Sequence, residues 1–182
     1  MATWNTRGLR GSALEDVINR TNERYKEKNI ALIQKIPTPI TPVRMDKENR
    51  QIILAYFDQQ STVDYIGVVQ GIPVCFDAKE CASSTFPVQN IHEHQAVFME
   101  QFERQGGVAF LLIYFSGANL AYYMRFEELL TFWNRAKEGG RKSFRMEELD
   151  PRFFMDMKTN LYLPYLDRMN LDLSMREELD NP

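Results

Sequence analysis

The stretch STVDYIGVVQGIPVCFDAKE (61–80) carries charged side chains inside an otherwise apolar segment. Its apolar and β-branched runs on either side of Gly71 are typical of two strands joined by a tight turn. Because side chains alternate along a strand, Asp77 and Lys79 are expected on one face. The turn can also bring Asp64 of the first strand beside Asp77. The segment therefore predicts a hairpin that presents two carboxylates and an ammonium group together.

This arrangement has a direct chemical interpretation. Carboxylates that lie close together raise each other's pKa unless a cation neutralises them, and oxygen ligands favour Mg²⁺, with Mn²⁺ as the alternative. Thr62 falls on the same strand face as Asp64 and adds an oxygen atom. Lys79 could orient or deprotonate a water, or offset the charge that develops on a phosphoryl group during attack. The pattern is consistent with metal-assisted phosphodiester hydrolysis.

A simpler interpretation stands beside it. Asp77 and Lys79 could form an exposed ion pair on a surface strand with a polar outer face. Short D-x-K triplets are common, so the spacing alone favours this simpler interpretation, and the second strand improves the case for a metal site only modestly.

Length and composition limit the class of protein. The 182 residues, 44% of them hydrophobic, suit a single domain over 1–182 with a sizeable core. We expect a cytoplasmic protein without a membrane partner, because no run approaches the roughly 18 apolar residues of a membrane span and the start lacks the apolar centre of a secretory signal. The net charge of −3 does not indicate a nucleic-acid binder, so any DNA contact must come from local patches. The two cysteines, Cys75 in a strand and Cys81 in the loop after it, are expected to be unpaired.

Helical and strand patterns alternate along the rest of the chain. They predict helices over 12–28, about 90–105 and 126–138, and strands over 30–36, 108–115 and 119–125. This order predicts the α/β class, with a mixed central β-sheet flanked by helices on both faces. One of Tyr122 and Tyr123 is expected to face outward, and REELDNP (176–182) is expected to be a frayed, solvated tail.

The segment 37–59 is predicted to leave the sheet. Its first part, PTPITPV, holds three prolines, which remove hydrogen-bond donors and exclude a central strand. IILAYF (52–57) then returns as a second extended arm. We expect a projecting, two-armed excursion.

Several segments together resemble one family. NTRG (5–8), QKIPTPI (34–40), AYFDQQSTVDY (55–65), CFDAKE (75–80), FPVQNIHEHQ (86–95) and GRKSFR (140–145) occur in the order, and nearly at the spacing, of the RecU family of Holliday junction resolvases. The resemblance covers residues 5 to about 145. It implies a restriction-endonuclease-like fold of the PD-(D/E)xK superfold and a homodimer. It further implies a Mg²⁺-dependent endonuclease that acts on four-way junctions or related branched DNA in recombination and repair, with a RecA-type recombinase as a further partner.

The resemblance also assigns roles to residues. It places the metal site on Thr62, Asp64, Asp77 and Gln95, and the catalytic, transition-state-stabilising lysine on Lys79. The excursion 37–59 resembles the family's stalk, which projects toward the junction centre.

Two features depart from the family pattern. The second acid of the motif is usually glutamate, and here it is the shorter Asp77. Acidic residues, Asp46, Glu48 and Asp58, are interspersed in a stalk region that is usually basic. Because phosphate contacts supply much of the affinity for DNA, we expect weaker binding.

Other polar residues have two interpretations each. Arg7, Lys35, Arg141 and Lys142 are candidate DNA contacts, although isolated basic residues are more often only solvated. Glu15 is either an accessory acid near the metal or the capping partner of Ser12, and the local cap is favoured. The spacing of His92 and His94 does not suit two zinc ligands on one helical face.

Three functions remain open from the sequence. The first is a homodimeric, metal-dependent endonuclease that cuts branched DNA. The second is a non-catalytic, junction-binding or recombinase-modulating scaffold. The third is a nuclease of the same superfold that acts on other DNA.

Overall fold

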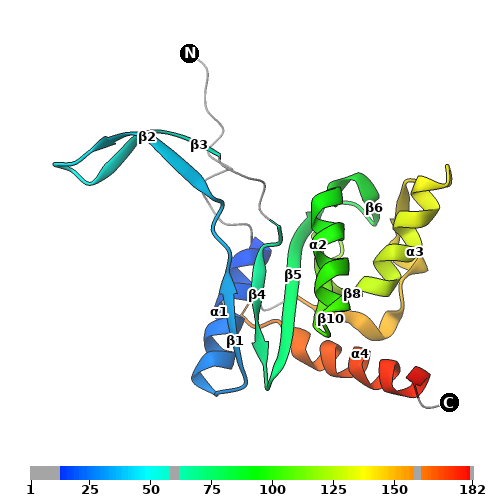
Figure 1. Cartoon of the computed structure of the whole chain (residues 1–182). Helices are drawn as coiled ribbons and strands as arrows, with labels where there is room; N and C mark the ends of the chain where they lie inside the picture. The colour runs from blue at the N-terminus through cyan, green and yellow to red at the C-terminus, as the bar shows by residue number, and fades with distance from the viewer. Residues whose placement is uncertain (1–12, 58–61, 158–160, 181–182) are drawn as a thin grey trace.

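A mixed sheet forms the centre of the protein. The computed structural model describes residues 13–57, 62–157 and 161–180. The sheet has six strands in the order β1 (Ala31–Lys35), β4 (Tyr65–Val69), β5 (Ile72–Cys81), β7 (Val108–Phe115), β8 (Leu120–Arg125) and β10 (Phe154–Asp156). Only β5 and β7 of this sheet pair in parallel, and its other neighbours pair antiparallel. The predicted α/β class with a mixed central sheet is confirmed (Figure 1).

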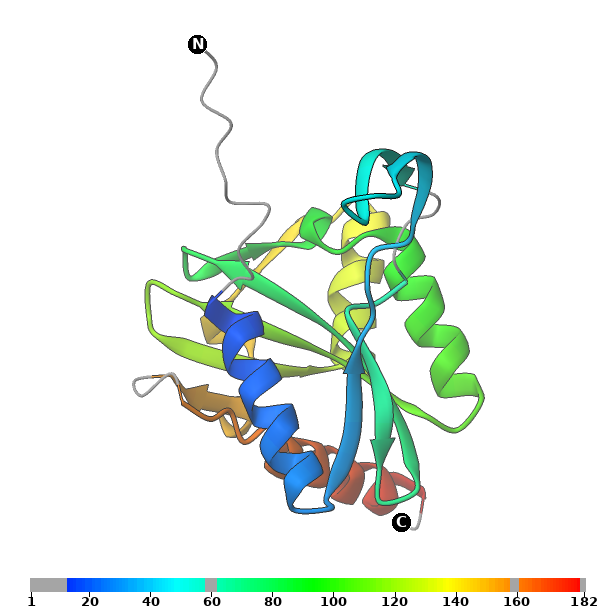
Figure 2. The same ribbon diagram turned by 90° about the vertical axis from the view of Figure 1, so that its left-hand side faces the viewer.

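Two helices cover each face of the sheet. The helices are α1 (Ala13–Glu27), α2 (Glu93–Arg104), α3 (Phe126–Lys137) and α4 (Tyr165–Asp180). Tyr65 donates to Asn19 of α1, and the Phe76 ring contacts Tyr165 of α4, which places α1 and α4 on one face. Asp77 and Tyr122 point the other way, where they contact α2 and α3 respectively. Figure 2 shows α1 in front of the sheet and α4 below it.

Stacked rings run across the α1/α4 face of the sheet. The ladder consists of Tyr65, Phe76, Phe110, Tyr123 and Phe153, with neighbouring ring centroids 4.4–5.8 Å apart. Buried aromatic pairs of this kind contribute about 0.5–1.5 kcal/mol each beyond the area that they bury. The ladder therefore ties four strands of the sheet and the short helix η4 (Pro151–Phe153) into one rigid platform.

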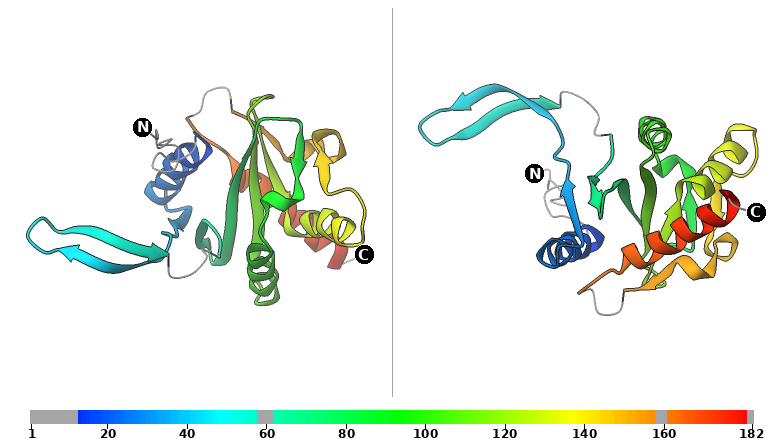
Figure 3. Two further views of the ribbon diagram at one scale, coloured as in Figure 1. Left: turned by 90° about the horizontal axis from the view of Figure 1, so that it is seen from above. Right: turned by 60° about the horizontal axis from the view of Figure 1, so that its bottom comes forward.

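The predicted excursion is a separate β-hairpin. β2 (Ile40–Asp46) pairs antiparallel with β3 (Gln51–Phe57), and the two strands project from the sheet between β1 and β4 (Figures 1 and 3). The carboxylate of Asp46 accepts hydrogen bonds from the backbone N–H groups of Glu48 and Asn49, so this acid closes the turn at the tip. Most of the exposed large apolar side chains in the described part of the chain lie on this hairpin. Residues 58 and 59 of the predicted stalk lie outside the described residues.

Small elements close the far side of the fold. β6 (Thr85–Pro87) pairs antiparallel with β9 (Ser143–Arg145), and η2 (Val88–Asn90) leads from β6 toward α2. A further short helix, η3 (Met146–Glu148), follows β9.

Three local predictions were wrong. Residues 176–180 are not a frayed tail but the last part of α4, where Arg176 pairs with Glu103 of α2 and with the buried Asp172. Tyr122 and Tyr123 are both fully buried, because helices cover both faces of β8. Cys81 lies at the end of β5 rather than in a loop.

Two further observations concern cysteines and membranes. Cys75 and Cys81 are free thiols. Among the described residues, no helix is both long enough and apolar enough to cross a membrane.

Candidate metal centre

β5 presents the central pair of the site. Asp77 and Lys79 lie on the same face of this strand, as alternation predicted, and Lys79 Nζ is 2.5 Å from Asp77 Oδ2. The side chain of Asp77 is 0% exposed and that of Lys79 is 18% exposed. The pair therefore lies in the interior, and the interpretation of an exposed surface ion pair is wrong.

Asp64 approaches this pair from the neighbouring strand. It immediately precedes β4, and the pairing of Tyr65 with Phe76 sets it next to Asp77. Its Oδ2 accepts a hydrogen bond of 2.9 Å from the backbone N–H of Ala78, and its own carbonyl oxygen accepts from the N–H of Ile36. The carboxylate is thus fixed against β5 by backbone contacts.

Gln95 reaches the site from α2. Its Nε2 donates to Asp77 Oδ1 at 2.7 Å, and its Oε1 accepts from the backbone N–H of His92 at 3.2 Å. The first turn of the helix therefore holds the amide in place. In this orientation the amide presents N–H to the carboxylate, and its oxygen would reach a cation there only after a rotation of the amide group.

The electrostatics of the centre fit a cation. Burial, reinforced by the charge of Asp64, raises the pKa of Asp77 from 3.8 to about 7, although Lys79 opposes the rise. Asp77 Oδ2 lies close to Lys79 but has no hydrogen bond of proper geometry within the described part of the chain. A buried carboxylate oxygen that meets only the ammonium group of Lys79, beside a second carboxylate, suits a hard divalent ion.

The number of acidic ligands limits which ion fits. No group of three or more His, Cys, Asp or Glu side chains in the described ranges could hold a metal ion. Mg²⁺ commonly binds through one or two carboxylates and keeps several waters. Asp64 and Asp77 therefore match Mg²⁺ or Mn²⁺ better than a fully protein-ligated zinc site.

Comparison with known proteins adds the family. A model of the family RecU, described as Recombination protein U, matches residues 9–171. The chain belongs to the RecU family. A Holliday junction resolvase RecU from Geobacillus sp. (strain WCH70) is 43% identical over 147 residues, which cover 79% of this chain and 73% of that relative. A Holliday junction resolvase RecU from Pediococcus pentosaceus is 39% identical over 164 residues, which cover 87% of this chain and 82% of that relative.

A solved structure of an archaeal Holliday junction resolvase, Hjc from Archaeoglobus fulgidus, is more distant. It aligns with 60% of this chain and 77% of its own at 9% identity, with a TM-score of 0.36. At that score it does not inform the geometry of the RecU site.

The remaining predicted site residues are placed less centrally in this RecU chain. Thr62 is exposed and makes no hydrogen bond with the two carboxylates within the described residues. Lys35 lies on the α1 face of the sheet, where its Nζ is 2.5 Å from Glu15 Oε2. Ser12, the proposed capping partner of Glu15, lies outside the described residues, as does Arg7.

Arg141 and Lys142, two neighbouring candidate DNA contacts, have different surroundings. Arg141 is paired with Glu148, which also accepts from Arg135 at 2.9 Å and from the backbone N–H of Arg145. These contacts hold the pKa of Glu148 down at about 2. Within the described residues, Lys142 is exposed and its ammonium group has no ion-pair partner. Within these residues the charge of Lys142 is therefore available to a phosphate, whereas Arg141 would have to exchange Glu148 for one.

Sequence reasoning missed Glu80, a residue on the face of β5 opposite the metal centre. Glu80, next to Lys79 and on the opposite face of β5, accepts a hydrogen bond of 2.8 Å from the backbone N–H of Leu14. This contact fixes the start of α1 against the end of β5 that carries the site. Alternation placed Glu80 on that face, but the sequence did not indicate that the start of α1 would lie there.

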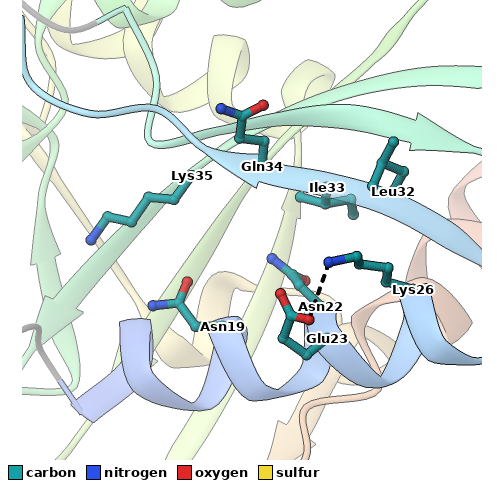
Figure 4. A pocket seen from close by; sticks show the side chains of 8 residues that line it. All are labelled: Asn19, Asn22, Glu23, Lys26, Leu32, Ile33, Gln34 and Lys35. Carbon is teal, nitrogen blue, oxygen red and sulfur yellow. Dashed lines mark hydrogen bonds and ion pairs between the residues drawn. The ribbon is translucent and has the colours of Figure 1, made fainter.

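A cavity on the α1 face is separate from the centre. It has a volume of about 360 Å³ and lies between α1 and β1 (Figure 4). Figure 4 shows the ion pair of Lys26 with Glu23 within it and Lys35 at one end. Asp64 and Asp77 do not line this cavity, so it does not belong to the metal centre.

Proposed function

We propose that this chain is an endonuclease that resolves Holliday junctions or related branched DNA in recombination and repair, with Mg²⁺ held by Asp64 and Asp77. The observation that carries the proposal is the buried Asp77, which lies beside Lys79 and is bonded to Gln95. Membership of the RecU family, whose relatives bear the name Holliday junction resolvase, supports the choice of substrate.

Each residue of the centre is assigned one role in metal binding or catalysis. Asp64 and Asp77 bind the ion, Gln95 holds the Asp77 carboxylate in its orientation, and Thr62 is the further candidate ligand. When bound, the ion supplies Lewis-acid stabilisation of a phosphodiester under attack. Lys79 lies close enough to place its positive charge beside the phosphoryl group, where negative charge develops during cleavage.

Binding of the junction is assigned to other parts of the molecule. The β2–β3 hairpin is proposed to reach toward the junction centre, and Lys142, Arg141, Arg7 and Lys35 are proposed to contact phosphates. Two chains in a homodimer would supply two cutting centres for the two strands. We place this activity in the cytoplasm, with a RecA-type recombinase as a further partner.

A cleavage assay tests the proposal. Purified protein is incubated with a synthetic four-way junction and Mg²⁺ or Mn²⁺, and compared with Asp77→Asn and Lys79→Ala. We expect the wild type to cut, and both variants to bind the junction without cutting it. Lys28→Ala, at the opposite end of α1 from the site, is the matched control and should cut normally.

Two results would contradict the proposal. Cleavage that survives both substitutions would show that the centre is elsewhere. A wild type that binds the junction but never cuts it would favour the non-catalytic scaffold. Asp77→Glu, which restores the usual length of the acid, then tests whether the shorter aspartate side chain limits the rate of junction cleavage.

A further inference from the structure

A small apolar pocket lies beside the first turn of α2. It has a volume of about 190 Å³ and is lined by Val88, Gln89, Trp133, Ala136, Lys137 and Lys142. Ligand sites for whole small molecules are usually about 300–1,000 Å³. The pocket is therefore of a size for a single planar group.

Its lining combines an aromatic ring with positive charge. Trp133 is only partly buried, and Lys137 Nζ lies 5.5 Å from the centre of its ring. Lys142 adds an exposed ammonium group at the rim, and its carbonyl oxygen accepts from the N–H of Val88, which fixes the β9 side of the pocket to η2. Because Lys137 is already paired with Glu93, Lys142 is the cation of this lining that is available to a phosphate. An aromatic ring beside such a cation is a combination that holds a DNA strand, because a base stacks on the ring while a phosphate meets the cation.

The pocket is connected to the metal centre by one helical turn. Lys137 is paired with Glu93 at 2.9 Å, and Gln95, in the same first turn of α2, is bonded to Asp77. In Figure 1 the start of α2, β6 and the end of α3 lie at the same end of the molecule as the β2–β3 hairpin. A strand that passes Asp77 would therefore continue toward Trp133.

We propose that this pocket binds an unpaired base of the DNA strand that lies next to the cutting site. A base inside a duplex is stacked and paired and cannot enter such a pocket, so the occupant is a base that the branch point leaves unpaired. The inference rests on the proposed function. It adds that junctions with unpaired nucleotides at the crossover are the preferred substrate class.

The fluorescence of Trp133 gives a direct test. The chain has two tryptophans, so Trp4→Phe leaves Trp133 as the single reporter. This protein is titrated, without divalent metal, with a four-way junction that is fully paired and with one that carries unpaired thymidines at the crossover. We expect the second junction to quench the emission and the first to leave it unchanged.

Variants identify the groups responsible. Trp133→Leu should weaken binding of the unpaired junction by about 10-fold and leave binding of the paired junction unchanged. Lys142→Ala, which removes a proposed phosphate contact, should weaken binding of both junctions. Trp133→Phe keeps an aromatic face and should behave like wild type, which separates stacking from a loss of packing. Lys28→Ala removes a distant charge and should alter neither affinity.

Several outcomes decide the matter. Equal emission with both junctions, or equal binding by Trp133→Leu and wild type, would overturn the proposal. Cleavage of the junction in Mg²⁺ without any response of Trp133 would reject the base pocket and leave the proposed function standing. Quenching by unpaired thymidines in a protein that never cuts would support the pocket and reject the proposed catalysis.

Discussion

Removing the charge of Asp77 should make the metal-free protein more stable while it abolishes cleavage. Burial and the charge of Asp64 raise the pKa of Asp77 from 3.8 to about 7. At 1.36 kcal/mol per pKa unit, the ionised carboxylate lowers the free energy of unfolding by at most about 4 kcal/mol. Relaxation of the charged site toward water reduces this figure, so we expect Asp77→Asn to gain about 2–4 kcal/mol at about pH 8.

The pH dependence provides the sharper test. The folded state holds the Asp77 proton more tightly than the unfolded chain between about pH 4 and pH 7. The stability of the wild type relative to Asp77→Asn therefore falls as pH rises through this window and is constant above it. We expect the advantage of Asp77→Asn to shrink to about 1–2 kcal/mol at about pH 5 and to vanish below about pH 4.

Urea unfolding of the two proteins in the presence of a chelator measures this difference. Glu27→Gln removes an exposed charge at the end of α1 and should show no such pH-dependent gain. Added Mg²⁺ should stabilise the wild type, by about 2.7 kcal/mol at 100 times the dissociation constant, and should leave Asp77→Asn unchanged. An Asp77→Asn protein that is no more stable than wild type at about pH 8, or whose gain is the same at about pH 5, would refute the electrostatic argument.

Three further predictions concern other parts of the chain. Lys79→Ala should slow junction cleavage by about 10²–10³-fold with little change in binding, and a rate within the error of wild type in single-turnover assays would contradict its role. Arg176→Ala leaves the buried Asp172 without its cation, so we expect urea unfolding to show a free energy of unfolding that is lower by about 3–5 kcal/mol. Arg104→Ala breaks an exposed ion pair with Glu100 and should lower it by less than about 1 kcal/mol. Replacing 40–57 with a short Gly-Ser linker should preserve the unfolding midpoint but remove the preference for junctions over duplex in competition binding, and a large loss of stability would show that the hairpin supports the sheet.

The candidate site was predictable where one strand determines it. Alternation along β5 placed Asp77 and Lys79 on one face, and the turn at Gly71 gave the pairing that brings Asp64 beside them. The depth of burial of Asp77 was not predictable, because it depends on α2 packing over β5. The orientation of the Gln95 amide likewise depends on its contact with His92, which no spacing indicates.

Elsewhere, contacts between different elements overrode local patterns. Tyr122 and Tyr123 alternate, so one of them was expected to face outward. Instead both are buried, and the Tyr122 hydroxyl donates a hydrogen bond to Glu128 of α3 while the Tyr123 hydroxyl donates one to Asp172 of α4. The charged end of α4 looked like a solvated tail, but Arg176 anchors it to Glu103 of α2. Asp172 and Glu103 are 49 and 73 residues away from their partners Tyr123 and Arg176, whereas Glu128 is only six residues from Tyr122 but lies in the next element.

The position of the hairpin in the chain limits what a change in it can disturb. β1 and β4 are adjacent strands, with Lys35 opposite Tyr65, so the excursion leaves and rejoins the sheet at neighbouring points. An insertion whose two ends lie next to each other can change in length or surface without shifting the register of β1 and β4. The hairpin can therefore change in length or surface without moving Asp64 and Asp77, because the pairing of β4 with β5 holds these two acids in place.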